Sequence, residues 1–146
     1  MSTIRERIQD AMKDALRAKE SERLMTLRMM KGALLLKEKD GSGAVSEDDT
    51  IATLRSEVKK REQTIELLRE HNKPNEIAET EREIAVIQEF LPAQLTMEQV
   101  EERVKAFLAA NPDITHAGRL TGALKKELGD AVDGKMLSEA CQKALS

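Results

Sequence analysis

The chain has 146 residues, which is enough for one ordinary domain or two small ones. Its hydrophobic content is 40%, its charged content is 35%, and Phe90 and Phe107 are its only aromatic residues. This composition favours a helical protein with an aliphatic core, and it excludes a nucleic-acid binder that stacks bases on aromatic platforms. The net charge of −3 gives no global attraction to nucleic acid or anionic lipid.

The single cysteine, Cys141, cannot form an intramolecular disulfide and fits a reducing compartment. Residues 1–10 contain no apolar signal region, and no run approaches the roughly 18–20 apolar residues of a membrane span. We therefore expect a cytoplasmic protein with no membrane partner.

Charge is distributed unevenly along the first part of the chain. Residues 1–40 carry ten Lys/Arg against seven Asp/Glu, whereas residues 41–91 carry seven against twelve. This asymmetry favours ion pairing between a basic first helical hairpin and an acidic second one. A basic outer face for a polyanion is the alternative.

Four amphipathic patterns occupy the first part of the chain. Apolar residues recur at helical spacing, and no alternating run predicts a strand. The predicted helices cover residues 3–19, 22–38, 47–71 and 75–91. The expected N-caps of the first three are Ser2 or Thr3, Ser21 and Ser46.

The second of these helices has more apolar residues than one stripe requires. Met25, Met29 and Leu36 widen its apolar face, which predicts burial on more than one side. Gly32, in mid-helix, predicts close packing of another helix. After this helix, residues 40–44 read Asp-Gly-Ser-Gly-Ala, which predicts a mobile loop.

The stretch Phe90-Leu91-Pro92-Ala93-Gln94-Leu95 combines a helix stop with a helix start. Pro92 is expected to end the fourth helix at Leu91. Thr96 then opens a capping box, and Leu95 and Val100 can form a hydrophobic staple across it. We expect a boundary between domains 1–91 and 92–146, with Leu91, Pro92 and Leu95 as a defined hinge.

Three shorter helical patterns follow, over residues 97–110, 116–128 and 134–145. Thr115 and Asp133 are the expected N-caps of the last two, and Gly129 is the expected C-cap between them. Gly118 and Gly122 predict the close approach of another helix. The fold expected is all-α: an N-terminal bundle of about four helices, followed by a small three-helix C-terminal domain.

The sequence predicts no catalytic residue, no metal and no cofactor. Cys141 falls on an inward helix face, and the two histidines, His71 and His116, lie far apart at helix ends. No cluster has zinc-ligand spacing, and no glycine-rich phosphate loop occurs. The enzyme alternative would use Glu79 or Glu83 together with Lys60 or His71.

Four stretches resemble the YqeY family: residues 11–34, 54–68, 81–100 and 118–145. The most specific element is Leu-Pro-x-Gln-Leu at residues 91–95, and others are Val-Lys-Lys-Arg at 58–61 and Asp-Gly-Lys at 133–135. A YqeY-like domain also forms the C-terminal tail of the B subunit of glutamine-dependent aspartyl/glutamyl-tRNA amidotransferase.

The resemblance implies an all-helical two-part fold and a role beside tRNA. In the amidotransferase, the tail helps bind tRNA, whereas glutamine hydrolysis and phosphoryl activation belong to other parts. A label as a carbon–nitrogen ligase with glutamine as amido-N-donor would be inherited from that larger enzyme. We expect a non-catalytic module, with such ligase activity as an alternative.

The leading functional prediction is a tRNA- or RNA-associated module whose cations contact phosphates. Its candidate residues lie on three of the predicted helices, and they are Lys59, Lys60, Arg61, Arg23, Arg28, Lys31, Arg119, Lys125 and Lys126. A solvated or intramolecular ion pair is the alternative role of each, above all of Arg28 and Arg61, which interrupt apolar stripes. The second function is an adaptor for an amidotransferase or translation protein, with Met12, Met25, Met29 and Met30 forming an adaptable groove unless they are buried.

Overall fold

The computed structural model describes residues 2–40 and 45–146, and these form seven α-helices and one 3₁₀ turn with no strand. The prediction of an all-α protein is confirmed. The chain divides into two compact units, residues 1–91 and 92–146. No helix in the described ranges is both long enough and apolar enough to cross a bilayer.

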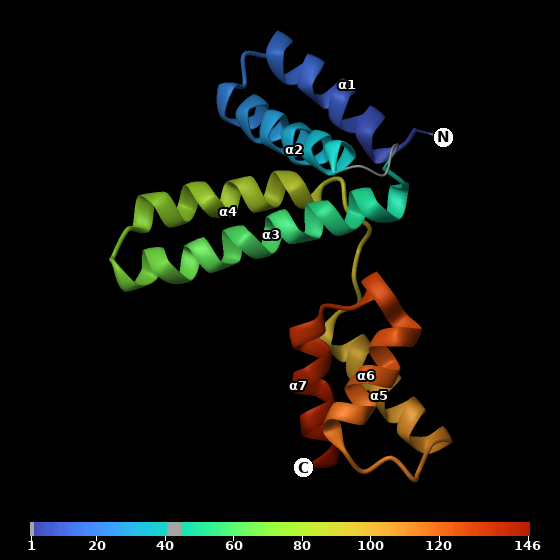
Figure 1. Ribbon diagram of the computed structural model, residues 1–146. Coiled ribbons are helices and arrows are strands. Elements are labelled where there is room, and N and C mark those ends of the chain that lie inside the picture. Colours follow the sequence, from blue (N-terminus) through green and yellow to red (C-terminus); the bar gives the residue numbers. More distant parts are fainter. Residues whose placement is uncertain (1, 41–44) are drawn as a thin grey trace. The chain divides into compact units, whose positions relative to one another are not determined.

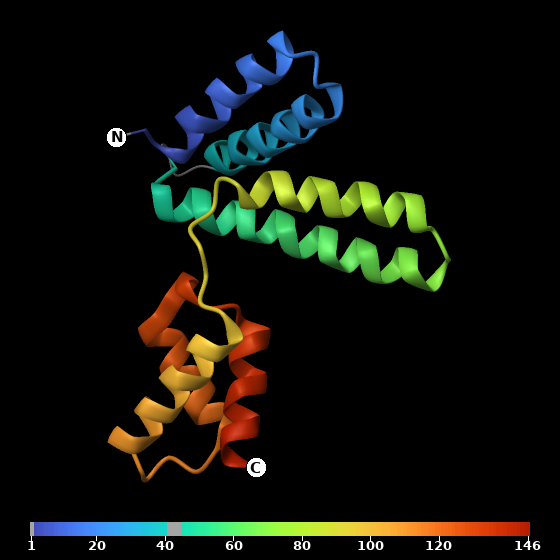
Figure 2. The same ribbon diagram turned by 180° about the vertical axis from the view of Figure 1, so that it is seen from behind.

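Two helical hairpins build the first unit (Figures 1 and 2). Its helices are α1 (Ile4–Arg17), α2 (Ser21–Lys39), α3 (Glu47–Glu70) and α4 (Pro74–Gln88). The pairs α1–α2 and α3–α4 are antiparallel, and α2 packs on both α3 and α4. The predicted loop at residues 40–44 lies, apart from Asp40, outside the described residues.

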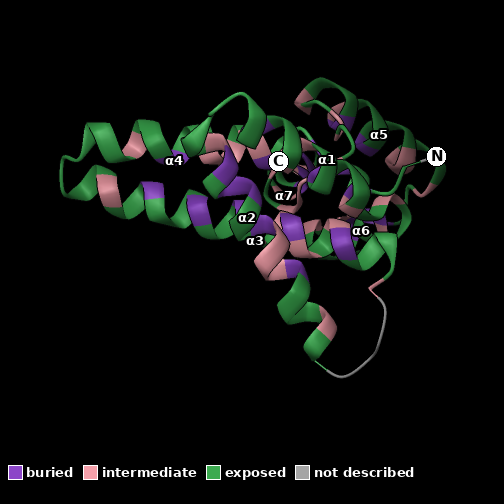
Figure 3. Ribbon diagram, turned by 90° about the horizontal axis from the view of Figure 1, so that it is seen from above, coloured by how far each residue is buried: buried purple, intermediate pink, exposed green. Residues whose placement is uncertain are grey.

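The core of the first unit consists of aliphatic side chains and one phenylalanine. It contains Ile4, Ile8, Ala15, Leu24, Leu27, Met30, Leu34, Leu54, Val58, Ile87 and Phe90. At the far end of the α3–α4 hairpin, residues 66–79 are mostly exposed (Figure 3). The core therefore lies where the two hairpins cross.

Two predictions about α2 are wrong. Met25, Met29 and Leu36 are exposed, so this helix is not buried on their side. The core residues of α2 face α1, α3 and α4, whereas these three remain largely open to solvent, although the Met29 sulfur lies 4.0 Å from Arg61 of α3. A Cβ built on Gly32 would meet no atom within 4 Å, so Gly32 does not serve close packing.

Two helices of the first unit begin at their predicted N-caps, where a hydroxyl reaches the backbone N–H three residues later. The Thr3 and Ser46 hydroxyls accept hydrogen bonds from the backbone N–H groups of Glu6 and Asp49. The predicted Ser21 cap is wrong, because Ser21 is already the first helical residue and its predecessor makes no side-chain cap.

Two helices of the first unit end in Schellman motifs. The N–H groups of Lys19 and Glu20 bond back to the Leu16 and Ala15 carbonyls, and α3 ends in the same way around Asn72. Lys19 and Asn72 consequently have φ values of 59° and 52°. Asparagine tolerates this left-handed conformation better than lysine does.

The second unit consists of α5 (Met97–Ala110), α6 (Ala117–Leu128), the 3₁₀ turn η1 (Gly129–Ala131) and α7 (Gly134–Leu145). Helix α7 packs on both α5 and α6. The buried residues between them are Val100, Val104, Ile114, Leu120, Leu124, Val132, Leu137, Ala140 and Cys141. All are small or aliphatic, as the composition predicts.

The capping box of α5 is confirmed in both directions: the Thr96 hydroxyl accepts from the Gln99 N–H, and the Gln99 side chain accepts from the Thr96 N–H. Asp133 caps α7 as predicted, and Gly129 ends α6 with φ of 54°.

Two other predictions about α6 are wrong. Its N-cap is His116 rather than Thr115, and no side chain makes the cap bond. Gly122 has open space at the Cβ position, and the only atom near that of Gly118 is a nitrogen of the His116 side chain, at 3.8 Å. Neither glycine admits another helix.

The segment between α4 and α5 is held from both sides. Helix α4 ends at Gln88 rather than at Leu91. Phe90, two residues further on, is buried in the core of the first unit, and the guanidinium of Arg7 lies 5.4 Å from its ring centroid. Leu91 packs on the first core and Leu95 on the second. The defined hinge stays a prediction.

Candidate nucleic-acid interface

The basic triplet of α3 does not present three equivalent cations. Lys59 is exposed and makes no ion pair within the described residues. Lys60 is also exposed, but its Nζ lies 3.2 Å from the carboxylate of Glu57. Arg61 is buried. Only the first two side chains can therefore reach a phosphate in solvent.

Arg61 instead joins three helices of the first unit. Its Nε donates to Glu83 of α4 at 3.3 Å, and its Nη1 donates to the Glu57 carbonyl at 3.1 Å and to the Glu57 carboxylate at 3.2 Å. Its Nη2 lies 4.0 Å from the sulfur of Met29 on α2. The charge in the apolar stripe of α3 is thus a structural ion pair, the alternative role that the sequence assigns to Arg61.

The cations of α2 divide in the same way. Arg23 binds the carboxylate of Glu89 with two nitrogens, at 2.6 and 3.1 Å. This hydrogen bonding raises the pKa of Arg23, although burial opposes the shift. Lys31 donates to the Gln9 side chain at 2.9 Å. Arg28 is exposed and has no ion pair among the described residues, so the structural role suggested for it is not found.

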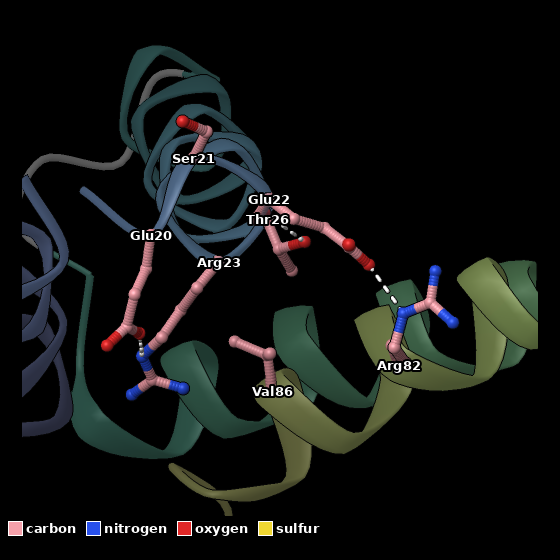
Figure 4. A pocket seen from close by; sticks show the side chains of 7 residues that line it. All are labelled: Glu20, Ser21, Glu22, Arg23, Thr26, Arg82 and Val86. Carbon is pink, nitrogen blue, oxygen red and sulfur yellow. Dashed lines mark hydrogen bonds and ion pairs between the residues drawn. The ribbon is translucent and has the colours of Figure 1, made fainter. Parts of the chain in front are cut away.

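A crevice of about 330 Å³ lies where α2 meets α4, and two ion pairs line it (Figure 4). The Arg82 Nε is 2.7 Å from the Glu22 carboxylate, and the hydrogen bond raises the pKa of Arg82. The Arg23 Nε is 3.9 Å from Glu20. The Glu22–Arg82 pair joins α2 to α4, whereas the Arg23–Glu20 pair stays at the start of α2. Each carboxylate that lines this crevice therefore already faces a guanidinium, which leaves no free acid there to act as a base.

In the second unit, Arg119 and Lys126 are exposed without an ion pair in the part of the chain described. Lys125 donates to the carbonyls of Gly129 and Val132, at 3.4 and 3.2 Å. It therefore satisfies acceptors at the C-terminal end of α6, where a positive charge is favoured.

Of the nine predicted phosphate contacts, four have no hydrogen bond or ion pair to another described residue: Arg28, Lys59, Arg119 and Lys126. Two lie on the first unit and two on the second. The sequence could identify the charges but not their partners, because Glu83 and Glu89 lie 22 and 66 residues from the arginines that they bind.

The family model described as "Yqey-like protein" matches residues 5–145, nearly the whole chain. The chain belongs to the YqeY-like family. Comparison with curated proteins finds no match. The family resemblance seen in the sequence is thereby confirmed over both units of this YqeY-like protein.

The remaining candidate catalytic side chains of the YqeY-like protein are buried, far apart or ion-paired. Cys141 is buried, as predicted. His71 and His116 flank helix ends. The enzyme alternative is weakened because Glu83 binds Arg61 and Lys60 binds Glu57. Across the described residues, no three His, Cys, Asp or Glu side chains are grouped to hold a metal ion.

A second surface of the YqeY-like protein is apolar. Met25 and Met29 are exposed, Met12 is half-buried and Met30 is buried. The four methionines therefore do not form one groove, but two of them lie on the open side of α2. Their exposure is the observation that keeps the adaptor function open.

Proposed function

We propose that this YqeY-like protein is a non-catalytic helical module that contacts tRNA or another RNA through its phosphates. The proposal is carried by four exposed cations that have no acidic partner within the described residues: Arg28, Lys59, Arg119 and Lys126. A cation that is not neutralised by its own chain can displace counterions from a phosphate.

The mode of RNA contact follows from the aromatic content and the charge of the chain. Phe90 is buried and Phe107 is half-buried, and the chain has no other aromatic residue. Base stacking therefore contributes nothing, and contact is to backbone and shape rather than to base edges. Net charge is −3, so affinity depends on a few local cations and is modest.

Family membership supplies the second support. The resemblance to the tail of the amidotransferase B subunit favours tRNA over other polyanions. The activation and glutamine-hydrolysis parts of that enzyme have no counterpart in the motifs of this chain. Binding without catalysis is consequently the proposed role.

The test is tRNA binding to the full chain, measured by fluorescence anisotropy over a salt series. The variant Arg28→Gln/Lys59→Gln loses two cations, and Arg103→Gln/Lys105→Gln is the matched control because it removes two exposed cations from outside the proposed set. Each lost phosphate contact reduces the slope of log K against log salt by about 0.7–0.9. We expect a change of about 1–2 for the first variant and none for the control.

Two results would overturn the RNA proposal. One is no detectable binding of tRNA at low salt. The other is an equal change of slope in both variants, since this would show that binding follows overall charge rather than Arg28 and Lys59.

The second candidate function is a protein adaptor, which the exposure of Met25 and Met29 favours. Methionine side chains adapt to varied apolar partners and are frequent at binding surfaces. A pull-down from native extract with and without RNase treatment separates the two candidates. A protein that stays bound after RNase treatment supports the adaptor, whereas loss of every partner supports RNA contact alone.

A further inference from the structure

One side of α2 carries an exposed apolar stripe. Met25, Met29 and Leu36 are exposed by 66%, 46% and 71%, and they stand at positions i, i+4 and i+11 of the helix. Gly32, at i+7, continues the line. These positions share one helix face, so the stripe is continuous for about 17 Å along α2.

This stripe is not an ordinary scatter of surface apolar residues. Among the described residues the exposed large hydrophobics are Leu16, Met25, Met29, Leu35, Leu36 and Leu67, and four of these six lie on α2. Other residues of α2, among them Leu24, Leu27, Met30 and Leu34, are buried in the core that this helix shares with α1, α3 and α4. A gathered apolar surface on one uncovered helix face marks an interaction site more often than isolated residues do.

The centre of the stripe is open. A Cβ built on Gly32 would meet nothing within 4 Å, so no side chain from residues 2–40 or 45–146 covers it. The larger side chains of Met29 and Leu36 lie before and after Gly32 along the stripe. A glycine between larger side chains leaves a shallow notch into which the backbone of another helix can approach closely.

Two exposed cations of α2 lie beside the stripe. Both acids of α2 are engaged within the chain, Glu22 with Arg82 and Glu38 with Arg5. Arg28, between Met25 and Met29 in sequence, and Lys39 at the end of the helix are exposed without an ion pair in the described part of the chain. The apolar face is therefore bordered by uncompensated positive charge.

Beyond Leu36 the surface changes character. A groove of about 490 Å³ between α2 and α3 is lined by Leu36 and by side chains of both signs, among them Lys37, Lys60, Asp40 and Asp49. Its mixed charge selects neither sign of partner. The stripe with Arg28, rather than this groove, thus sets the charge that an occupant must carry.

We propose that the exposed face of α2 (Met25, Met29, Gly32 and Leu36, bordered by Arg28 and Lys39) docks one amphipathic helix of a partner protein whose apolar edge is flanked by Asp and Glu. Apolar anchors spaced over three turns fit a helix laid along α2. The two methionines allow the fit to adapt, and the acidic flanks complement Arg28 and Lys39. This inference rests on the adaptor function, and it shares only Arg28 with the proposed RNA contacts.

The probe is a pair of fluorescein-labelled synthetic helices with the same leucine stripe, one flanked by Glu and the other by Lys. Their binding to the full chain is measured by fluorescence anisotropy. We expect the Glu-flanked peptide to bind at least tenfold more tightly than the Lys-flanked one, with weaker binding at high salt. Equal binding of the two peptides, or binding of neither, overturns the proposal.

Two variants test whether the peptide binds to α2. Gly32→Glu adds bulk and negative charge at an open position, and Gly122→Glu is the matched control because Gly122 also has open space in a helix. We expect the first to weaken binding of the Glu-flanked peptide at least tenfold and the second to leave it unchanged. An equal effect of both variants overturns the assignment of the face.

The methionine methyl signals give a direct readout in the same chain. On addition of the Glu-flanked peptide, the ¹³C-methyl resonances of Met25 and Met29 should shift, whereas that of Met30, which is 1% exposed, should not. Shifts confined to other methionines contradict the proposal.

Competing occupants are separated by the neutral variant Met25→Ser/Leu36→Ser, with Leu67→Ser as the control at another exposed leucine. We expect the first variant to bind the Glu-flanked peptide at least tenfold more weakly and to keep the tRNA affinity of the wild type. Loss of tRNA together with the peptide identifies the face as an RNA site and overturns the proposal. A wild-type dimer that becomes a monomer in this variant, seen by sedimentation, identifies a second copy as the occupant and also overturns it.

Discussion

Replacing Arg61 by methionine tests whether this arginine holds the first unit together. Methionine keeps most of the unbranched stem and removes the guanidinium. The substitution leaves the carboxylates of Glu57 and Glu83 without their shared cation, at 17% and 22% side-chain exposure. The middle of α3 then faces two carboxylates, of which Glu57 keeps only the exposed Lys60 as a cation and Glu83 loses its cation.

The magnitude follows from the burial of the three groups. The Arg61 side chain is 9% exposed and makes three hydrogen bonds to oxygen. Breaking a fully buried pair costs about 3–5 kcal/mol, whereas an exposed pair contributes about 0–1 kcal/mol. Because the two glutamates are partly solvated, we expect Arg61→Met to lower the free energy of unfolding by about 2 kcal/mol.

The assay is urea unfolding followed by far-ultraviolet circular dichroism, with hydrogen exchange of α3 and α4 peptides to assign the loss to the first unit. A double-mutant cycle of Arg61→Met with Glu83→Gln should give a coupling energy of about 1–2 kcal/mol. The matched pair is Arg69 and Glu66 on the same helix, 3.0 Å apart and exposed by 61% and 73%. We expect about 0.5 kcal/mol or less for that pair.

Two outcomes would refute this reasoning about Arg61. One is a stability of Arg61→Met equal to that of the wild type, and the other is a coupling to Glu83 no larger than that of the exposed pair. Either would mean that the buried guanidinium is not needed for the stability of the first unit.

Three further predictions follow from local geometry. Lys19→Gly should raise the free energy of unfolding by about 0.5–1 kcal/mol in urea unfolding, because glycine adopts the left-handed conformation at φ of 59° without the steric cost; an unchanged or lower midpoint would count against strain at this turn. Hydrogen bonding from Arg5 holds the pKa of Glu38 below its ordinary 4.5, so the ion pair stabilises the fold above that pH and the contribution is lost as the pH falls through the lowered value. The melting temperature of Glu38→Gln should therefore lie below that of the wild type at pH 6, and the difference should shrink as the pH falls below 4.5; a constant difference would contradict the linkage. Leu91→Ser should accelerate hydrogen exchange in the first unit only and Leu95→Ser in the second only, because each leucine packs on a different core; acceleration of both units by either variant would show that they unfold together.

The features that the sequence predicts correctly are short-range. Thr3, Ser46, Thr96 and Asp133 each cap a helix by bonding to a backbone N–H three residues ahead. The reach of such a bond is set by helix geometry alone, so spacing in the sequence is enough to predict it. Apolar residues that recur at helical spacing over several turns likewise identify the helices, because an amphipathic helix must bury its hydrophobic face in any fold.

The wrong predictions of helix ends occur where neighbouring residues can each serve as the helix boundary. Ser21 and Thr115 are both good cap residues, but the observed N-caps are their neighbours Glu20 and His116. Pro92 forbids a helix beyond Leu91, yet α4 stops earlier, at Gln88, and Phe90 enters the core beside Arg7. The burial of Phe90, which tertiary packing provides, decides where that helix ends.

By itself, the sequence determined that this protein is helical, where most helices begin, which residues can be buried and which family it resembles. Only the tertiary structure decided which charges remain available and which apolar face stays open. Arg61 and Lys59 are equally basic in the sequence, but one faces Glu83 and the other faces solvent. Met29 and Met30 are adjacent, yet only Met30 is covered. The physical reason is that exposure depends on neighbours from distant parts of the chain, which local spacing does not encode.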